Sequence, residues 1–370
     1  MDLTFSDEQR LLADGVERLL GQVRDFHARR AQLAEGVTLA PAVWRHLADQ
    51  GLLALPRSEA VGGMGGNIVD VVAIAMRFGA ALLTEPYLAT VVLAGAALEA
   101  AGGDDAKALL AQIAAGDAVV AFAHDEDVSG APADQITTAA IAKEDGFVLT
   151  GCKPLVLGAA EAQHLVISAR YDDGVALFLV GAAANGVTTE SYITVDGRGA
   201  GRVRLDDVAV PQGSLLLGDA GRVIERIVAD ATIYLAAESV GAMEALFRMT
   251  ASYAATRNQF GVPIGSFQTV AHRLADMKIA LTKAHASLIY VTALQEAGQA
   301  TASDISALKA QTGRLGRALA EAAVQTHGGV GMTDELAVGH LLKRLLANDA
   351  LFGDAELHLR LLGSRLSARA

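Results

Sequence analysis

The sequence predicts a multidomain α+β protein: an N-terminal helical domain, a middle antiparallel β domain and a C-terminal antiparallel helical bundle. Three observations support this order. Apolar residues recur at helical spacing early in the chain, short β-branched runs fill its middle, and long amphipathic segments fill the rest. We expect a helical domain over residues 1–115, a β-barrel or sandwich over 116–220 and a four-helix bundle over 221–370.

The first domain begins with a helix-capping signal. Ser6 and Gln9 are spaced so that a hydroxyl and an amide can satisfy free N–H groups of the first turn, and helically spaced apolar residues follow. The glycine-rich stretch 62–66 then interrupts the pattern. Because no apolar strand precedes it and no Lys-Ser or Lys-Thr pair follows, we predict a connecting turn rather than a phosphate-binding loop.

The second domain is marked by strand-like runs separated by acidic-Gly turns. The runs lie at residues 119–123, 147–149, 165–168 and 175–180. The turns lie at residues 144–146, 172–174 and 196–197. Glycine supplies the positive φ that tight hairpins require, so this pattern predicts a small antiparallel β domain. Cys152 falls in this domain, and we expect a buried, unreactive thiol.

The third domain is helical to the end of the chain. The expected helices span about 222–256, 268–298, 302–326, 334–351 and 355–367. Ser303 is placed to cap the third of these helices, whose apolar residues share one face. Long helices joined by short connections favour an antiparallel bundle.

Composition excludes several classes of function. The apolar fraction of 52% and the charged fraction of 19% exclude a disordered chain and favour an oligomer. A net charge of −12 argues against nucleic acid and anionic membranes as partners. Neither a membrane-spanning run nor a signal peptide is visible, so we expect a cytoplasmic protein. Scattered histidines predict no metal site, and no Gly-x-Ser-x-Gly motif indicates a hydrolase.

Motifs in order along nearly the whole chain resemble those of the acyl-CoA dehydrogenase family. The strong ones are Arg257-Asn258-Gln259-Phe260-Gly261, Pro263-Ile264, Phe267-Gln268, His272-Arg273-Leu274-Ala275-Asp276-Met277, Lys309 and Gln325-Thr326-His327-Gly328-Gly329-Val330-Gly331. Weaker similarities are the opening at residues 6–12, Gly62-Gly63-Met64-Gly65 and Asp206-Asp207-Val208-Ala209-Val210-Pro211. The helical–β–helical organisation agrees with the family as well.

The resemblance implies an FAD-dependent enzyme that α,β-dehydrogenates an acyl-CoA thioester and passes electrons to an electron-transfer flavoprotein or a similar acceptor. It places four side chains and one glycine pair against the FAD of a neighbouring subunit: Arg257, Phe260, Gln268, Gln325 and Gly328-Gly329. An arginine suits a pyrophosphate, and paired glycines let the main chain approach a cofactor closely. His327 has two interpretations, a contact with cofactor phosphate or adenine and a solvated loop residue.

The same resemblance indicates what this chain lacks. The reaction needs a carboxylate that removes the α proton, and the family places its glutamate at the position of Gly353 or, alternatively, of Ala231. Asp354 and Asp230 each lie one residue away. Asp354 is the candidate base, although we favour a helix cap at this position, and we expect Asp230 to be solvated or ion-paired.

The segments that in the family contact the subunit's own flavin ring are also altered. Residues 124–130 replace a Thr-Glu-Pro run and the Gly-Ser-Asp that follows it, and Leu155-Val156-Leu157 replace Trp-Ile-Thr. Aliphatic groups cannot pair with the polar edge of an isoalloxazine, which costs on the order of a few kcal/mol.

The leading hypothesis is therefore the non-catalytic subunit of a heteromeric α2β2 acyl-CoA dehydrogenase, with a homologous subunit as partner. The resemblance associates such assemblies with sterol side chains and pimeloyl-type dicarboxylates. One alternative is a self-sufficient homotetramer with Asp354 or another carboxylate as base. Another is a flavin-free scaffold or CoA-ester-binding protein.

Overall fold

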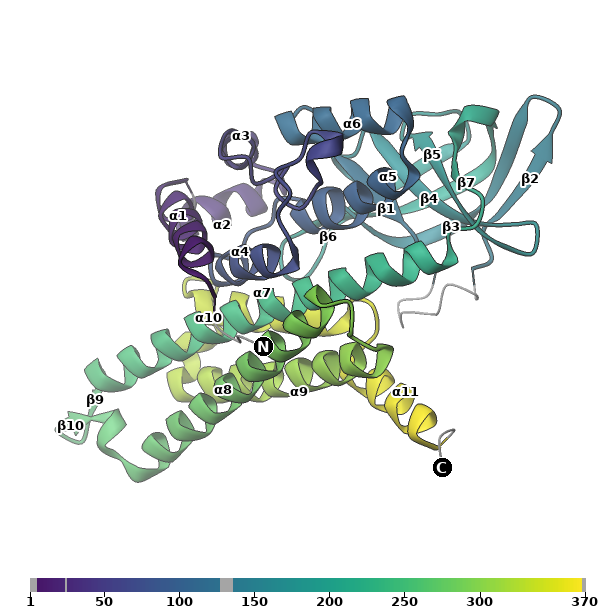
Figure 1. Ribbon diagram of the computed structural model, residues 1–370. Coiled ribbons are helices and arrows are strands. Elements are labelled where there is room, and N and C mark those ends of the chain that lie inside the picture. The colour runs from purple at the N-terminus through teal and green to yellow at the C-terminus, as the bar shows by residue number, and fades with distance from the viewer. Residues whose placement is uncertain (1–4, 24, 127–135, 368–370) are drawn as a thin grey trace. The chain divides into compact units, whose positions relative to one another are not determined.

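Figure 1 shows the computed structural model, which describes residues 5–23, 25–126 and 136–367. The chain forms two compact units. The bundle unit contains the residues up to 22, residues 68–83 and the residues from 232 onward, and the sheet unit contains residues 23–67 and 84–231. The division falls inside helix α7 (Gly221–Thr256), whose first part belongs to the sheet unit.

The bundle unit is built from helices and one short hairpin. Besides α7 these are α1 (Asp7–Val23), α4 (Ile68–Ala80), β9 (Asn258–Gln259), β10 (Val262–Pro263), η5 (Ile264–Ser266), α8 (Gln268–Glu296), α9 (Ala302–His327), η6 (Gly328–Met332), α10 (Ala337–Ala350) and α11 (Ala355–Ser367). The expected C-terminal helices are confirmed, with ends that differ by a few residues. No helix within the described ranges is both long enough and apolar enough to cross a membrane.

Helix capping is confirmed at α1 and corrected at α9. The Ser6 N–H donates to Gln9 Oε1 (3.0 Å), and the Gln9 N–H donates to Ser6 Oγ (3.2 Å). At α9 the cap is Thr301 rather than Ser303, because the helix begins at Ala302 and Ser303 lies inside its first turn. Thr301 and Asp304 bond to each other's backbone N–H groups and form a capping box.

Glycines let two helices of the bundle unit come into backbone contact. A Cβ on Gly79 of α4 would overlap the carbonyl oxygen of Glu238 of α7, and a Cβ on Gly241 of α7 would overlap that of Met76. Neither position therefore accommodates a larger residue without movement of one helix.

A buried polar network joins α7 to α10. Glu238 accepts a hydrogen bond from the Tyr234 hydroxyl (3.0 Å) and lies 3.6 Å from Arg344 NH1. Asn348 donates to Ser239 Oγ (3.2 Å), and Arg344 NH2 donates to the carbonyl of Leu83 (2.8 Å). These partners compensate for the burial of charge inside the bundle unit.

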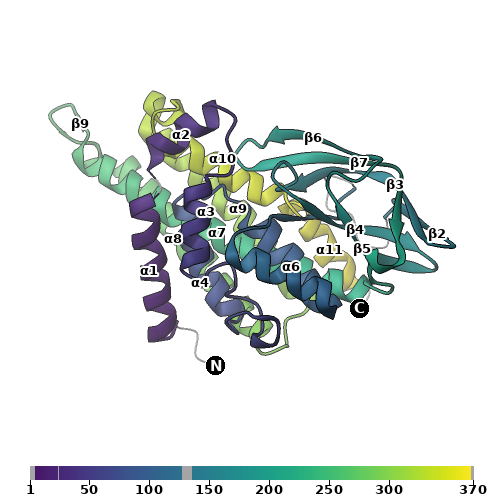
Figure 2. The same cartoon turned by 90° about the horizontal axis from the view of Figure 1, so that it is seen from above.

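The sheet unit contains helices and a mixed sheet. Its helices are α2 (Phe26–Ala34), α3 (Pro41–Asp49), η1 (Glu59–Val61), η2 (Tyr87–Ala94), α5 (Gly95–Ala101), α6 (Gly103–Ala115) and η4 (Gln212–Ser214). Its strands are β1 (Val120–Ala123), β2 (Ala139–Lys143), β3 (Gly146–Leu157), β4 (His164–Tyr171), β5 (Gly174–Gly181), β6 (Val187–Ile193), β7 (Gly199–Pro211) and β8 (Leu215–Leu217). The strand order is β6-β7-β3-β2-β4-β5-β8, with β1 beside β4, and Figure 2 shows the twist of the sheet.

The expected antiparallel pairing is found along most of this sheet, with two exceptions. β1 pairs with β4 in parallel over Val120–Ala123, and β2 meets β4 in parallel at a single residue pair. A parallel pair needs a long connection. Between β1 and β4 the chain supplies one, because the β2–β3 hairpin lies between them in sequence.

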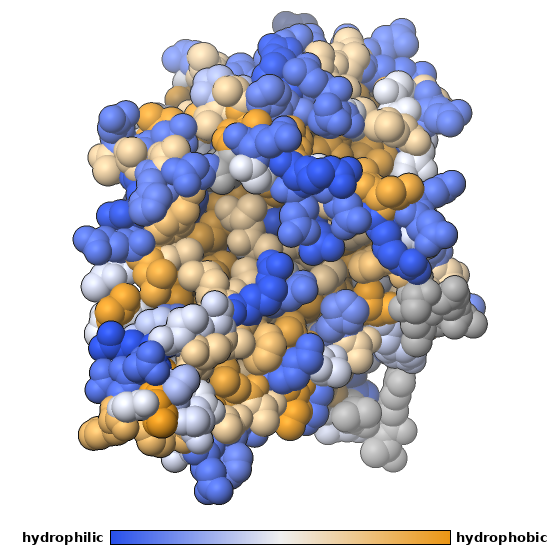
Figure 3. All heavy atoms as spheres, turned by 90° about the vertical axis from the view of Figure 1, so that its left-hand side faces the viewer, coloured by the Kyte–Doolittle hydropathy of each residue, from blue (hydrophilic) through white to orange (hydrophobic). Residues whose placement is uncertain are grey.

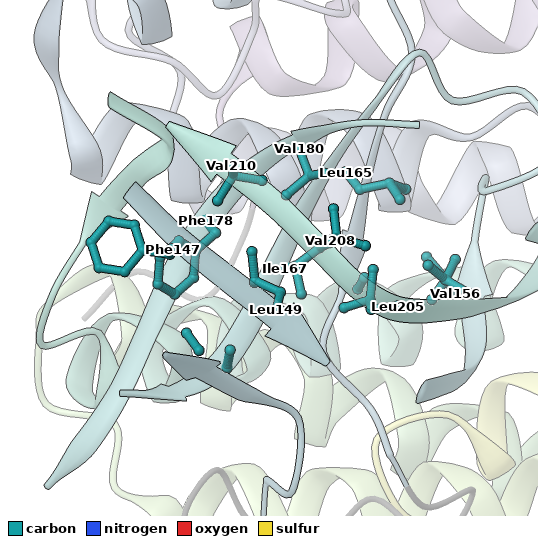
Figure 4. Close-up of a cluster of buried hydrophobic side chains, with 14 of the residues drawn as sticks. Phe147, Leu149, Val156, Leu165, Ile167, Phe178, Val180, Leu205, Val208 and Val210 are labelled. Atoms are coloured by element: carbon teal, nitrogen blue, oxygen red, sulfur yellow. The ribbon is translucent and has the colours of Figure 1, made fainter. Parts of the chain in front are cut away.

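The core of the sheet unit is formed by inward-facing apolar residues of successive strands (Figure 4). The rings of Phe147 and Phe178 lie 5.1 Å apart in an edge-to-face arrangement. The prediction of a buried Cys152 is wrong: its side chain is exposed, and that of Lys153 is buried instead. Adjacent strand residues face opposite sides of the sheet, so one of the two has to point inward.

The glycine-rich stretch 62–66 is a connecting turn, as predicted. The N–H groups of Gly63, Gly65 and Gly66 donate to the carbonyls of Ser58, Arg57 and Leu55 (3.0, 2.7 and 2.8 Å). Because these donors are used within the turn, they are not available to bind a phosphate.

Candidate functional site

The hairpin between α7 and α8 exposes an aromatic side chain in an unfavourable backbone conformation. Phe260 and Gly261, at the turn between β9 and β10, have φ values of +53° and +83°. This pair of positive angles is typical of a type I′ turn. A non-glycine residue in this region costs about 1 kcal/mol, yet Phe260 is 93% exposed. Its ring meets that of Phe267 edge to face, with centroids 6.2 Å apart, and a ligand or a second chain would be needed to bury it.

Arg257 lies directly before this hairpin, and Gln268 lies directly after it. The backbone of Arg257 is fixed on both sides, because its N–H donates to the carbonyl of Tyr253 and its carbonyl accepts from Ile264 (both 2.8 Å). Its side chain is exposed. Gln268 is the first residue of α8 and is also exposed.

After α9 ends, the exposed chain at Gly328–Gly329 consists of backbone without side chains. Gln325 is exposed in the last turn, and the helix ends at Gly328, whose φ of +66° and ψ of −144° suit glycine. A Cβ on Gly328 or Gly329 would meet no atom within 4 Å. The space outside this main chain is therefore open to another molecule.

An aromatic stack connects these two segments. The rings of Tyr253 on α7 and His327 on α9 lie 4.5 Å apart with an interplanar angle of 24°. His327 is buried, and its Nδ1 lies 2.9 Å from the carbonyl oxygen of Ala323. The expectation of a solvated His327 is thus wrong, because the ring packs within the bundle unit. Tyr253 precedes Arg257 by one helical turn, so the hairpin and the end of α9 occupy the same end of the bundle unit.

This end of the bundle unit carries an unusual set of exposed apolar residues. They are Phe260, Val262, Phe267, Val330 and Met332. Figure 3 shows hydrophobic residues among hydrophilic ones on the side of the molecule to which the β9–β10 hairpin belongs. We call this region, with Arg257, Gln268, Gln325 and Gly328–Gly329, the grip surface.

The loop between α10 and α11 has no room for a side chain at the first expected position of the base. Phe352 and Gly353 have φ values of +56° and +90°. A Cβ on Gly353 would lie 2.6 Å from Leu357 Cδ2 and 3.2 Å from His358 Nε2. His358 is itself held in place, because its Nε2 bonds to the carbonyl of Phe352 (3.0 Å).

Asp354 is the N-cap of α11. Its Oδ1 accepts a hydrogen bond from the Leu357 N–H (2.8 Å), so the expected helix cap is confirmed. The carboxylate stabilises the helix start by satisfying one free N–H group. Its alternative role as a base stays a prediction.

Lys309 of α9 binds the C-terminal end of α10, directly before the loop between α10 and α11. Its ammonium donates to the carbonyl oxygens of Asn348 and Asp349, the latter at 2.8 Å. Burial lowers the pKa of Lys309 to about 8, and the nearby charge of Asp349 opposes this shift. A cation at carbonyl groups that end a helix is favourable, so Lys309 anchors the loop.

The second expected position of the base is also without a proton acceptor. Ala231 is completely buried in α7. Its neighbour Asp230 pairs with Arg226, whose Nε lies 3.1 Å from Asp230 Oδ2. The expected ion pair is confirmed.

In the sheet unit, polar side chains form a cluster around His124 and Glu126, which directly precede residues 127–135. Lys153 Nζ donates to Glu126 Oε1 (2.8 Å), the carbonyl of His124 (3.0 Å) and Ser168 Oγ (3.1 Å). His124 Nδ1 also lies 3.0 Å from Ser168 Oγ. These groups bond to one another, and the remainder of the predicted flavin segment, residues 127–130, lies outside the described residues.

The protonation states of this cluster follow from burial. Burial, reinforced by the charge of Lys153, lowers the pKa of His124 to about 3, so the imidazole is neutral at pH 7. Burial alone would raise the pKa of Glu126, but Lys153 and the hydrogen bonds from Thr137 and Thr138 lower it to about 2. The result is a buried ion pair beside a neutral histidine.

Three family models match the chain in order. They describe the N-terminal domain (residues 6–117), the middle domain (121–208) and the C-terminal domain (220–367) of acyl-CoA dehydrogenases. Among curated proteins, acyl-CoA dehydrogenase FadE27 of Mycobacterium tuberculosis is 30% identical over 334 residues, which cover 88% of each chain. Acyl-CoA dehydrogenase IpdE2 of the same organism is 30% identical, with 90% of this chain and 89% of IpdE2 covered.

Solved structures agree with this result. The ChsE4-ChsE5 complex from Mycobacterium tuberculosis contains a chain that is 28% identical, with a TM-score of 0.92 and 99% of both chains covered. The Tcur3481-Tcur3483 steroid ACAD G363A variant gives a TM-score of 0.89 at 27% identity, with 98% of both chains covered. The protein belongs to the acyl-CoA dehydrogenase family, whose members are oxidoreductases that act on CH–CH donors.

Proposed function

We propose that this chain is the non-catalytic subunit of a heteromeric acyl-CoA dehydrogenase and that its grip surface holds FAD together with a homologous partner chain. The observation that carries the proposal is that the residues expected to contact FAD are present and exposed, while the carboxylate expected as the base is absent. The grip surface is exposed and complete, whereas Gly353 and Ala231 leave both positions of the base empty of any proton acceptor.

The grip surface fits FAD. Arg257 offers a guanidinium to a pyrophosphate, Phe260 offers an aromatic face, and Gln268 and Gln325 offer amides. The open main chain at Gly328–Gly329 allows close approach. When bound, FAD accepts the hydride from the β carbon of the acyl chain.

The sheet unit fits a flavin ring poorly. Val156 and Leu157 are aliphatic and pair with Gly201 and Ala200 of β7. His124 is buried and bonded to Ser168 rather than free to contact a ligand. We therefore assign the flavin ring and the proton-abstracting carboxylate to the partner chain.

The names of two similar proteins support an inference about the substrate class. The ChsE4-ChsE5 complex and the Tcur3481-Tcur3483 steroid ACAD each combine differently named chains, and the second is named a steroid ACAD. We infer that the complex dehydrogenates the CoA thioester of a steroid side chain and passes electrons to an electron-transfer flavoprotein or a similar acceptor.

The proposal is tested by expressing the chain alone and together with the dehydrogenase chain of a neighbouring reading frame. We expect the isolated chain to be colourless and inactive and the complex to be yellow and active on a steroid acyl-CoA. Arg257→Ala should reduce the FAD content and turnover of the complex at least about tenfold. Arg222→Ala, which removes an exposed arginine at the far end of α7, should change neither. Full FAD occupancy and turnover by the isolated chain would overturn the proposal.

Asp354→Asn separates this function from that of a self-sufficient enzyme. Asparagine caps a helix as well as aspartate does but cannot accept the α proton. We expect turnover of the complex and stability to remain near the wild-type values. A loss of about 10²-fold or more in turnover, with FAD retained, would identify Asp354 as the base.

A further inference from the structure

We propose that Tyr253 and His327 are positioning residues whose stacked rings hold the two halves of the grip surface in register. One half is the hairpin after α7, with Arg257 and Phe260. The other half is the end of α9, with Gln325 and Gly328–Gly329. This inference rests on the proposed function, because it concerns the order of a surface that holds FAD.

The stack is rigid on the histidine side. The carbonyl oxygen of Ala323 can only accept a hydrogen bond, so the Nδ1 of His327, 2.9 Å away, carries a proton and donates it. Ala323 lies one turn earlier in the same helix, and this bond fixes the plane of the ring. Tyr253 then covers that ring at 4.5 Å, and His327 is 4% exposed.

The main chain of η6 packs against the side chain of His327. This residue directly precedes Gly328, where α9 ends, and a Cβ on Gly331 would lie 2.9 Å from His327 Cβ. The segment therefore folds back over the base of the histidine side chain. Gly328 and Gly329 themselves face open space and have no side chains, so their position depends on the residue before them.

On the other side, Tyr253 is coupled to Arg257. The carbonyl of Tyr253, in the last turn of α7, accepts the N–H of Arg257, the first residue after the helix, at 2.8 Å. A displacement of Tyr253 would move the arginine and the start of the hairpin with it. The contact between the two rings thus couples the position of Arg257 to that of the main chain at Gly328–Gly329.

The consequence is an ordered binding surface before FAD arrives. A loop that is already held in its binding conformation loses less conformational entropy on binding. Two flexible glycines would otherwise be ordered at the expense of affinity. An aromatic ring at position 253 is sufficient for this role, because the stack uses its face.

The test compares Tyr253→Leu with Tyr253→Phe by hydrogen exchange of residues 328–332 in the isolated chain. Leucine supplies an apolar side chain without a stacking face, and phenylalanine supplies that face without the hydroxyl. We expect amide exchange to be at least about tenfold faster in Tyr253→Leu and unchanged in Tyr253→Phe. Tyr290→Ala, at a half-exposed tyrosine of α8, is the control and should exchange like the wild type.

A second readout uses the FAD complex with the partner chain. Tyr253→Leu should raise the dissociation constant for FAD at least about tenfold, and Tyr253→Phe should restore it. Wild-type exchange rates in Tyr253→Leu would overturn the positioning role whether or not the complex holds FAD. A wild-type complex without FAD would instead contradict the proposed function, and the exchange rates would still decide the role of the stack.

Discussion

Gly353 shows at the scale of a single residue why this chain carries no carboxylate at the first position expected for the base. The position combines a φ of +90° with close approach of Leu357 and His358 to any added Cβ, so both the backbone conformation and the space at this position favour glycine. A glutamate placed here would meet both strain and crowding. Restoring the base therefore requires more than one substitution.

Gly353→Ala should lower the free energy of unfolding by about 1–2 kcal/mol, because alanine is strained in the left-handed region. Urea denaturation of the isolated chain measures this loss. Gly363→Ala is a matched control in α11, where a Cβ would meet no atom within 4 Å and φ is not positive. The control should gain up to about 1 kcal/mol. Equal free energies of unfolding for the two variants would show that alanine is not strained at position 353.

His124 should make stability depend on pH. Its pKa is about 3 in the folded chain, below its ordinary value of 6.5, because it is buried and lies near Lys153. The unfolded chain therefore binds a proton that the folded chain does not, and stability present above pH 6.5 is lost as the pH falls toward 3. The slope from this group is about 1.4 kcal/mol per pH unit.

Urea unfolding of the wild type and of His124→Leu between pH 7 and pH 5 measures this slope. The variant should lose stability less steeply as the pH falls, and substitution of the exposed His46 should change nothing. His285 and His358, whose pKa values are also lowered by partial desolvation, contribute equally to both proteins, so only the difference between the two pH profiles reports on His124. Parallel pH profiles would show that His124 is protonated in the folded chain.

The site residues could be predicted from the sequence only where the main chain or a motif fixes them. Arg257, Phe260 and the glycine pair stand in a recognisable order. The role of Tyr253 and the inward orientation of Lys153 could not be predicted in this way. A tyrosine on a helix gives no signal of its stacking partner. The partners of Lys153 are distant in sequence, with Glu126 and Ser168 on either side of it.

At the scale of elements, α10 illustrates how a helix end is positioned by its neighbours. Lys309 of α9 binds the last carbonyls of α10, and Glu238 of α7 binds Asn348 and Arg344 on the adjacent face. The loop that follows is consequently held from two sides. Periodicity predicted these helices, because each has one apolar face, but it could not predict a network made of buried polar residues.

Removal of one member of the α7–α10 network should be costly. Glu238→Ala leaves Arg344, whose side chain is fully buried, without its carboxylate, and we expect a loss of about 3–5 kcal/mol in urea unfolding. The double variant Glu238→Leu/Arg344→Met should lose less than the single variant. Glu321→Ala, which breaks the exposed pair with Arg317, should cost roughly 0.5 kcal/mol or less. Equal losses at the two sites would argue against a buried ion pair.

The elements that the sequence mispredicted have local causes. The cap of α9 is Thr301 because its partner Asp304 completes a capping box, a pairing that outweighs the single hydroxyl of Ser303. The parallel β1–β4 pair could not be predicted from alternation, since alternation indicates a strand but not its neighbour. The domain boundaries expected near residues 115 and 220 remain predictions.

At the scale of the whole molecule, the proposed function requires two chains that complement each other. This chain offers an exposed grip surface and no proton acceptor at either family position, and under the proposed function a partner chain supplies the missing carboxylate. The exposed apolar residues around Phe260 are explained if a partner and its cofactor cover them. Homologous chains of one fold can form such an assembly because their interfaces share one geometry.

Native mass spectrometry of the complex with its partner chain tests this claim most directly, because it counts bound FAD and protein chains together. The account predicts fewer FAD molecules than chains in the complex and none on the isolated subunit. One FAD for every chain, or an isolated subunit that carries FAD, would contradict it.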